Sequence, residues 1–394
     1  MRRLPASFDA QQGLLSAAGM DVDISEALEP AGLTIDDLVY EDSRSLEWRG
    51  GEPTCLTSFG PVVEDVPVVS FFTGSGGMDL GFEAVGFAHK AAFEISEVFC
   101  DTLRMNRPNW TVFGPPFHTG DVSDFEAVVR DLSPLVSSPF EGVFVGGPPC
   151  QPFSIAANQR FSKAGPNFKR VGFEHAENGS LLFSYVQLIL EFKPAVFVIE
   201  NVPGLRDVDG GDQLSLAIGM LEDGGYRVAE PSVYDASDFG VPQYRRRMIV
   251  VGSRLPGDFA IKPIGDPVGC GGVLARLPGK GAFNHDTRNH KVMSVDRYMK
   301  LEYGQRDQLG RVDRLDPTRP SKTVIAGGTN GGGRSHLHPE IPRTLSVREC
   351  ARLQTFPDDY RFAGATARQF TQVGNAVPPV LAAVVAAEIG ATYF

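Results

Sequence analysis

The sequence predicts an α/β protein with a doubly wound, mostly parallel sheet and a second, smaller, loop-rich domain. From residue 66 onward, short runs rich in Val, Ile and Phe alternate with apolar stretches of helical length. A glycine-rich turn follows the first run, and from about 255 to 340 the periodicity fades and Gly, Arg, His and Asp dominate. This alternation favours parallel strands with ligands bound at their carboxyl ends.

Each predicted strand is a short β-branched or aromatic run that ends at glycine, an acidic residue or a basic residue. Residues 1–66 form a separate extension, with helical patterning around 7–18 and 24–39. The last predicted helix is apolar on every side and should pack back on the sheet. The predicted strands are 66–72, 87–94, 142–147, 195–200 and 246–254, and the predicted helices are 180–192, 212–226 and 378–390.

Composition narrows the class of protein. The chain has 394 residues, of which 42% are hydrophobic and 22% charged, as in ordinary soluble proteins. No apolar run approaches the ~20 residues of a membrane helix, and the N-terminus lacks the apolar core of a signal peptide. The five cysteines are widely spaced without a C-x-x-C pair, which predicts reduced thiols and neither a disulfide framework nor a metal site. A cytoplasmic location is therefore expected.

Charge is distributed unevenly along the chain. The net charge of −11 argues against a nucleic-acid partner if it is taken as a whole. However, residues 1–66 hold 13 acids against 4 Lys/Arg, whereas residues 254–342 hold 14 Lys/Arg against 9 acids. Since charges beyond about 10 Å are screened at physiological salt, a polyanion could bind the basic segment.

The glycine turn FTGSGGMDLG begins at Phe72, directly after the first predicted strand. Such a turn lets a ligand approach the backbone. About half of such glycine turns bind a nucleotide-like ligand, and the rest are tight turns without a ligand. Glu94 ends the next strand 20 residues after Gly74, where an acid accepts hydrogen bonds from ribose hydroxyls. Asp121 could contact the adenine end of a nucleotide-like ligand, or it could only cap its own turn.

A cysteine lies among prolines in GGPPCQPFS, residues 146–154, at the end of the third strand. A lone cysteine is usually an inert buried thiol. Prolines fix the backbone, so they would hold the Cys150 thiol at the ligand crevice. The residues that follow, 151–179, predict a mobile loop able to close over a polyanion, or else a solvated surface loop.

Two further strand ends carry ionisable side chains. Glu200 closes the fourth strand, where partial desolvation would favour its protonated form. In QYRRR, residues 243–247, strand alternation sends Gln243, Arg245 and Arg247 to one face, where guanidiniums could hold a carbonyl oxygen or phosphates. The alternatives are a Glu200–Arg ion pair and a solvated basic edge strand.

Together these segments resemble the DNA (cytosine-5)-methyltransferases. FTGSGGMDLGFE is similar to the family's first cofactor motif, GGPPCQPFS to its Pro-Cys motif, FVIENVPGL to its Glu-Asn-Val motif and VPQYRRR to its Gln-x-Arg-x-Arg motif. RTLSVRECARLQTFPDDY and QVGNAVPP are similar to its late helical and closing motifs. The motifs occur in the family's order and cover about 67–254 and 316–394, whereas residues 1–66 match no motif.

The resemblance implies a Rossmann-like S-adenosylmethionine-dependent methyltransferase domain, 67–254 plus 370–394, and a target-recognition domain, 255–369. Residues 1–66 are expected to be a packing arm or a protein-interaction surface. The implied catalytic residues are Cys150, Glu200, Arg245 and Arg247. The implied cofactor-binding residues are Phe72, Thr73, Gly74, Gly76, Gly77, Glu94, Ile95, Asp121, Val122, Pro149, Asn375 and Val377, and the substrate-binding residues are Gln151, Ser154, Asn201, Gln243 and Thr323.

Two positions depart from the family pattern. Ile95 stands where relatives often carry an aromatic side chain that packs on adenine, and Asn178 stands where they often carry an Arg late in the catalytic loop. The adenine wall and the contacts of the long loop are therefore expected to differ from those of the relatives.

The implied reaction is methyl transfer from S-adenosylmethionine to C5 of a flipped-out cytosine within a short duplex sequence, without a metal. Attack of the Cys150 thiolate on C6 would activate C5, Glu200 would assist at N3 and Arg247 would hold O2. The implied partner is double-stranded DNA, bound by a monomer of bacterial or phage origin. A cognate restriction endonuclease is a second partner if the enzyme belongs to a restriction-modification system rather than acting alone.

Three other functions fit the sequence less well. A branch of the same family methylates tRNA, but it carries a Cys-Phe-Thr element where this chain has Gln369-Phe370-Thr371. An inactive binding relative conflicts with the presence of Cys150 and Glu200. Amino methylation would need an aromatic residue after the two prolines, where this chain has Cys150.

Overall fold

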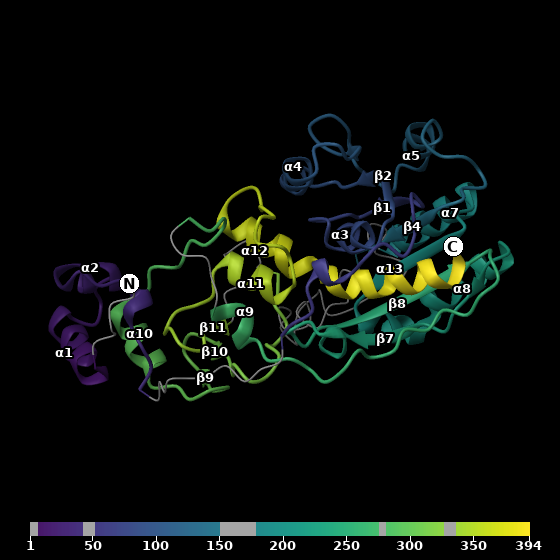
Figure 1. The fold of residues 1–394 in the computed structure, drawn as a ribbon. Helices are drawn as coiled ribbons and strands as arrows, with labels where there is room; N and C mark the ends of the chain where they lie inside the picture. The colour runs from purple at the N-terminus through teal and green to yellow at the C-terminus, as the bar shows by residue number, and fades with distance from the viewer. Residues whose placement is uncertain (1–6, 42–51, 150–178, 276–280, 327–335) are drawn as a thin grey trace. The chain divides into compact units, whose positions relative to one another are not determined.

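A computed structural model describes residues 7–41, 52–149, 179–275, 281–326 and 336–394 (Figure 1). By its internal contacts the chain divides into two compact units. We call the first the sheet unit: Cys55–Phe239, Arg245–Ile264 and Ala376–Phe394. The second is the small unit: Met1–Thr54, Gly240–Tyr244 and Gly265–Asn375. The N-terminal segment thus groups with residues 265–375, while the boundaries of the functional domains stay a prediction.

The sheet unit contains an eight-stranded sheet in the order β3-β2-β1-β4-β5-β8-β6, with β7 paired to β8. The first five strands are parallel, and β8, β6 and β7 are antiparallel to their neighbours. The strands are β1 (Pro67–Phe71), β2 (Ala88–Phe93), β3 (Val112–Phe113), β4 (Val143–Gly146), β5 (Val196–Asn201), β6 (Arg227–Val228), β7 (Ser232–Asp235) and β8 (Arg246–Ser253). The five predicted strands are therefore confirmed.

Helices cover both faces of this sheet, as the doubly wound prediction requires. On one face, α5, α7 and α8 bury an aromatic core in which Phe71 stacks on Phe93 with ring centroids 5.3 Å apart. On the other, α3 packs on α13 so closely that a Cβ on Gly81 would lie 2.5 Å from the Ala382 Cβ. The helices are α3 (Gly77–Ala84), α4 (Glu97–Asn106), α5 (Phe125–Leu132), α7 (Gly179–Phe192), α8 (Asp212–Asp223) and α13 (Pro379–Tyr393), with 3₁₀ turns at Leu56–Ser58, Pro203–Gly211 and Ala236–Phe239.

α13 is the predicted apolar C-terminal helix, and it is buried around most of its surface. The helical stretch 366–393 is apolar and long enough for a membrane span, but 78% of its most apolar window is buried inside the protein. Burial of this kind is what a core helix of a folded domain shows.

The small unit holds a three-stranded sheet, β11-β10-β9, and short helices. Long loops connect these elements, in agreement with the loss of periodicity along 255–340. The elements are α1 (Phe8–Ala18), α2 (Ile24–Leu28), α9 (Gly271–Ala275), α10 (Val292–Met299), β9 (Arg306–Asp307), β10 (Val312–Arg314), β11 (His336–Leu337), α11 (Val347–Leu353) and α12 (Thr366–Asn375), with 3₁₀ turns at Glu29–Ala31 and Ile35–Asp37.

The N-terminal helices differ from the prediction in one respect. α1 agrees with the patterning at 7–18, and Ser7 caps it by accepting a hydrogen bond from the Ala10 amide. The expected helix over 24–39 is wrong beyond Leu28. Pro30 has no amide hydrogen to continue the ladder, and Gly32 adopts a left-handed conformation with φ 63°, so the chain continues in 3₁₀ turns.

Candidate functional site

The carboxyl ends of four parallel strands lie at one level in the sheet unit. Phe71 of β1 is in register with Phe93 of β2 and with Gly146 of β4, and Gly146 is in register with Ile199 of β5. The chain order reverses between β1 and β4, which is where a doubly wound sheet opens a ligand crevice. The glycine turn, Glu94 and Gly147–Pro149 follow directly after these strand ends, and Glu200 is the last residue but one of β5.

The glycine turn is tied to Glu94. The Gly74 amide donates to Oε2 of Glu94 over 2.7 Å, and the Ser96 amide donates to Oε1 over 2.7 Å. Glu94 is only 6% exposed, and burial raises the pKa of its carboxyl, although the backbone hydrogen bonds oppose that rise. The carboxylate therefore orders the turn and retains lone pairs for a ligand.

The backbone of the turn matches its composition. Gly74 and Gly76 have φ of 60° and 78°, a left-handed conformation that glycine adopts without strain. Phe72 also has a positive φ, 53°. Thr73 is held from both sides, since its hydroxyl lies 3.1 Å from the Ser70 hydroxyl and its amide donates to the Phe93 carbonyl. Gly77 then begins α3, whose N-terminus faces the turn and favours an anionic group.

The remaining residues predicted for the cofactor lie in different environments. Ile95 is 63% exposed, whereas Val122 is buried in the aromatic core and Val377 is buried beside α13. Asp121 Oδ1 accepts hydrogen bonds from the amide and hydroxyl of Ser123, so this oxygen does cap its turn. Pro149 is exposed at the end of the described β4 segment.

Glu200 and Arg247 form an ion pair at the crevice. Arg247 Nε lies 2.8 Å from Glu200 Oε1, and each side chain is 12% exposed. Burial raises the pKa of Glu200, and the nearby guanidiniums of Arg247 and Arg245 oppose that rise. A Cβ on Gly147 would lie 2.9 Å from the other oxygen, Oε2. The carboxyl therefore sits directly against the segment that leads into Pro148 and Pro149.

Asn201 joins the same two segments. Its Nδ2 donates to the Pro148 carbonyl over 3.1 Å, and its Oδ1 accepts from the Val202 amide over 2.7 Å. The predicted substrate-binding residue thus ties the proline segment to the end of β5. Sequence reasoning did not find this tie or the approach of Gly147 to Glu200, because both depend on the pairing of β4 with β5.

Burial along residues 243–247, which lead into β8 at Arg246, alternates as the sequence predicts. Gln243 and Arg245 are buried, while Tyr244 and Arg246 are exposed. Arg245 is 1% exposed and donates to the Ala376 carbonyl over 2.8 Å, next to Val377. In the sheet unit, Arg245 therefore anchors the closing segment, and Arg247 pairs with the acid.

Gln243 lies in the small unit with its amide engaged. Oε1 accepts from the Val324 amide over 2.8 Å, and Nε2 donates to Gln354 Oε1 over 2.9 Å. The neighbouring Thr323 hydroxyl donates to the Tyr244 carbonyl over 2.6 Å. Gln243 is fully buried and holds the Thr323–Val324 dipeptide in place, while its contact with substrate stays a prediction. Asn375 is exposed at the end of α12.

Three predicted residues, Cys150, Gln151 and Ser154, lie outside the described residues, as does most of the predicted loop 151–179. Within the ranges that the structure describes, no group of three His, Cys, Asp or Glu side chains could hold a metal ion.

Comparison with known proteins identifies relatives over most of the chain. The family model for C-5 cytosine-specific DNA methylases matches residues 66–266 and 279–391. A Type II methyltransferase of Psychrobacter, M.PspPI, is 33% identical over 343 residues, covering 80% of this chain and 76% of the relative. M.MthTI, a Type II methyltransferase of Methanothermobacter thermautotrophicus, is 32% identical over 82% of this chain and 97% of its own.

Solved structures agree. A putative DNA modification methyltransferase encoded in an Escherichia coli prophage has a TM-score of 0.67 at 25% identity, over 82% of this chain and 98% of its own. A DNMT2 from Spodoptera frugiperda, 14% identical with a TM-score of 0.57 over 81% of this chain and 98% of its own, shares the fold. The match of the family model over most of the chain, together with relatives above 30% identity, places this chain in the C-5 cytosine-specific DNA methylase family, as a DNA cytosine-5 methyltransferase.

Proposed function

We propose that the chain transfers a methyl group from S-adenosylmethionine to C5 of a flipped-out cytosine in a short duplex DNA sequence, through a covalent bond between Cys150 and C6. The observation that carries this proposal is the placement of the Glu200–Arg247 pair against Gly147, three residues before Cys150. The glycine turn with its Glu94 brace lies at the neighbouring strand ends of the same unit.

The residues present fit the proposed cofactor. In the turn after β1, Gly74 is partly exposed and has no side chain to block a ligand, and Glu94 offers a buried carboxylate for ribose hydroxyls. S-adenosylmethionine supplies a methyl group on a positively charged sulfur, which makes the group electrophilic. The role of this chain is to bind and orient that group at the carboxyl ends of β1 and β4, where the chain order of the sheet reverses.

The chemistry of the base follows from the ionisable groups. The Cys150 thiolate adds to C6, and the electron pair of the C5–C6 double bond becomes available at C5 to take the methyl group. The bond between methyl and sulfur breaks, its electrons stay on sulfur, and S-adenosylhomocysteine is the product that leaves. Glu200, whose pKa burial raises, gives a proton or a hydrogen bond to N3 and so stabilises the adduct. Arg247, fixed by Glu200, holds O2. A base then removes the C5 proton, the double bond re-forms and the thiolate leaves.

The target cytosine must leave the duplex because its C6 atom is covered by the neighbouring stacked bases, and flipping it out costs a few kcal/mol. We assign the sequence reading to residues 255–369 and the closing of the site to residues 151–179. We also propose a cytoplasmic enzyme that acts as a monomer on DNA, with a cognate restriction endonuclease as a partner where one is encoded.

The test is covalent trapping. Wild-type protein with S-adenosylmethionine and DNA containing 5-fluorocytosine should give an adduct resistant to denaturation, and plasmid DNA should gain 5-methylcytosine by mass spectrometry, whereas tRNA should not. Cys150→Ala should abolish both signals. Cys55→Ala, which removes an exposed thiol elsewhere in the chain, is the matched control and should retain them. Full methylation by Cys150→Ala would falsify the mechanism.

A further inference from the structure

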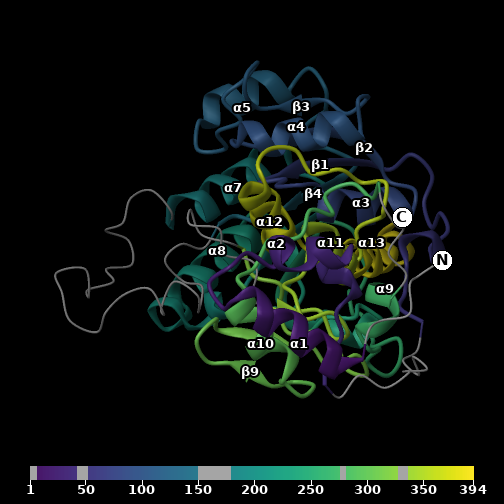
Figure 2. The same cartoon turned by 90° about the vertical axis from the view of Figure 1, so that its left-hand side faces the viewer.

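The N-terminal arm, which we define as residues 7–41, packs on one face of α10 in the small unit (Figure 2). Leu15 of α1 and Leu28 of α2 form one buried cluster with Val292, Val295 and Met299. These three α10 residues are spaced at i, i+3 and i+7, so they share one face of the helix. The match to the family model begins at residue 66, so the arm lies outside the matched residues.

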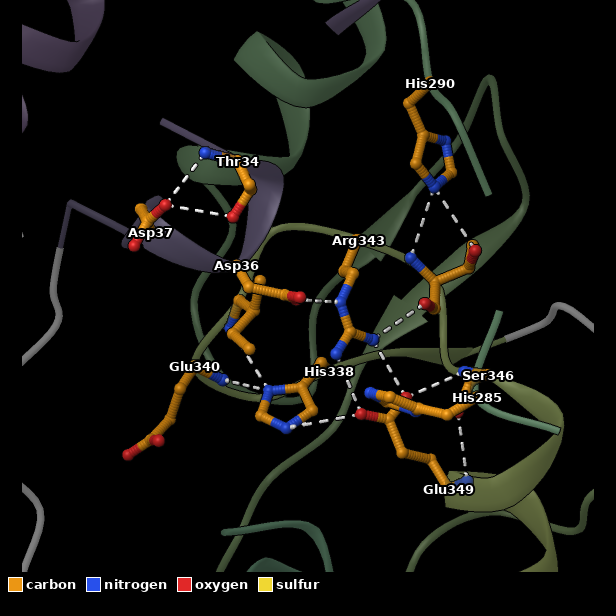
Figure 3. Close-up of polar contacts among 12 residues, drawn as sticks. Thr34, Asp36, Asp37, His285, His290, His338, Glu340, Arg343, Ser346 and Glu349 are labelled. Atoms are coloured by element: carbon orange, nitrogen blue, oxygen red, sulfur yellow. Dashed lines mark hydrogen bonds and ion pairs between the residues drawn. The ribbon is translucent and has the colours of Figure 1, made fainter. Parts of the chain in front are cut away.

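Polar contacts fix the arm at both ends of this cluster. Asp23 forms a β-bridge with Lys291, and their side chains pair over 2.9 Å just before α10 begins. At the other end, Asp36 accepts from Arg343 Nε over 2.7 Å, as Figure 3 shows. Arg343 is itself paired with Glu349 of α11. The arm is therefore anchored to α10 and to the buried network at the start of α11.

A different part of α10 holds the β9–β10 hairpin. Arg297 donates to both carboxylate oxygens of Asp307, over 3.1 and 3.4 Å. Asp307 Oδ2 in turn accepts from the Gly310 amide over 2.5 Å and so closes the turn. A Cβ on Gly310 would lie 3.1 Å from the Tyr298 hydroxyl oxygen, which shows how closely α10 approaches the tip. α10 is thus sandwiched between the arm and the hairpin.

The hairpin tip, Gln308–Arg311, presents an unusual surface. Leu309 is 78% exposed, and Gln308 and Arg311 beside it are exposed as well. The one acid of the turn, Asp307, is 6% exposed because it faces α10. The outward surface therefore combines an apolar side chain, an amide and a cation. Such a set suits DNA, where cations contact phosphates, amides read bases and apolar side chains wedge between base steps.

A second contact places further cations at the foot of the hairpin. Asp313 of β10 is 5% exposed in its side chain and pairs with both Arg306 and Lys322 over 2.9 Å. Lys322 precedes Thr323 of the Thr323–Val324 dipeptide, and the family resemblance predicts that Thr323 binds substrate. The basic foot of the hairpin and this dipeptide are therefore neighbours within the small unit.

We propose that the N-terminal arm and α10 position the β9–β10 hairpin so that its tip contacts the target DNA. Arg297 is the positioning residue between them, and the arm supports the opposite face of its helix. This inference rests on the proposed function, since it assumes that the substrate is duplex DNA.

The experiment compares single variants of the full chain on a duplex that wild type methylates. Arg297→Ala should raise KM for DNA at least about tenfold, as loss of a base contact does, with kcat and the affinity for S-adenosylmethionine within about twofold of wild type. Leu309→Ala, which changes the hairpin tip itself, should also raise KM for DNA. Arg297→Lys, which keeps one donor for Asp307, should recover part of the loss.

Control variants distinguish loss of hairpin positioning from the loss of a positive charge and from misfolding of the protein. Lys300→Ala removes the same charge beside the same helix but pairs with Asp296 instead of the hairpin, so KM for DNA should change less than about threefold. On the arm, Leu28→Ala should raise KM for DNA, while Glu26→Gln, an exposed change on the same helix, should not. Unchanged affinity for S-adenosylmethionine shows that the sheet unit is intact.

The outcomes are distinct. If wild type forms no 5-methylcytosine, the proposed function fails. If wild type methylates DNA but Arg297→Ala matches Lys300→Ala, or loses kcat without a change in KM for DNA, the positioning role is refuted. If Arg297→Ala raises KM for DNA as expected but Leu28→Ala has no more effect on KM for DNA than Glu26→Gln, the arm does not act through α10.

Discussion

Replacing Glu349 with Gln tests the buried network of Figure 3. Glu349 is fully buried and accepts two hydrogen bonds from Arg343, over 2.8 and 2.9 Å, and one from the Ser346 amide over 2.7 Å. Burial alone would raise the pKa of Glu349, but the Arg343 guanidinium outweighs burial and lowers the pKa to about 2, from an ordinary value of 4.5. The charged pair therefore stabilises the folded small unit.

The size of the effect follows from that difference. A pKa depressed by about 2.5 units corresponds to roughly 3 kcal/mol of folding free energy, which agrees with the cost of about 3–5 kcal/mol for removing one partner of a buried pair. Because the folded pKa lies below the unfolded one, this contribution is fully present above pH 4.5 and is lost as the pH falls toward 2. Glu349→Gln should therefore lower stability at pH 7 by about 3 kcal/mol.

Urea denaturation followed by circular dichroism measures the change. Asp358→Asn is the matched control, since it also removes a carboxylate from an arginine pair, with Arg352, but Asp358 is 47% exposed in its side chain. That control should cost less than about 1 kcal/mol. The acid side of the stability curve should also be flatter in Glu349→Gln than in wild type. Equal losses for the two variants would refute the assignment of the network as stabilising.

Two predictions concern the sheet unit. Glu94→Gln should weaken binding of S-adenosylmethionine about tenfold in calorimetry, since an amide loses one of the two charge-assisted backbone bonds that order the glycine turn; unchanged affinity would show that the turn orders itself. Glu200→Gln should lower kcat about 10²–10⁴-fold with DNA binding intact. Burial raises the pKa of Glu200, so the kcat of the wild type should decrease as the pH rises through that raised pKa. If kcat of Glu200→Gln depended on pH in the same way, Glu200 would not be the proton donor.

The strands and the crevice could be predicted from the sequence because their signals are local. Five β-branched or aromatic runs became β1, β2, β4, β5 and β8, and the glycines after β1 have the left-handed backbone that their residue type suggests. The alternation of burial from Gln243 to Arg247 was likewise a local pattern. These features need no knowledge of distant partners.

Features that depend on distant partners could not be predicted in this way. Gln243 was expected to face substrate with the two arginines, yet its amide binds Val324 and Gln354, 81 and 111 residues away along the chain. Residues 1–66 were expected to be a packing arm or a protein-interaction surface, but nothing in their sequence identifies α10 as the partner of the N-terminal arm. Long-range polar pairing of this kind has no periodic signature in sequence.

The need for glycine at position 147 is apparent only in the folded protein, where residue 147 lies against Glu200. Under the proposed mechanism, Glu200 needs a second oxygen for the base besides the one that pairs with Arg247, and that oxygen, Oε2, lies where a Cβ at residue 147 would be 2.9 Å away. Any larger residue would push this oxygen aside or break the pair. Asn201 meanwhile fixes the Pro148 carbonyl, so the proline segment and the acid keep a constant separation. The glycine makes room for the acid, and the asparagine sets its distance from the segment that carries Cys150.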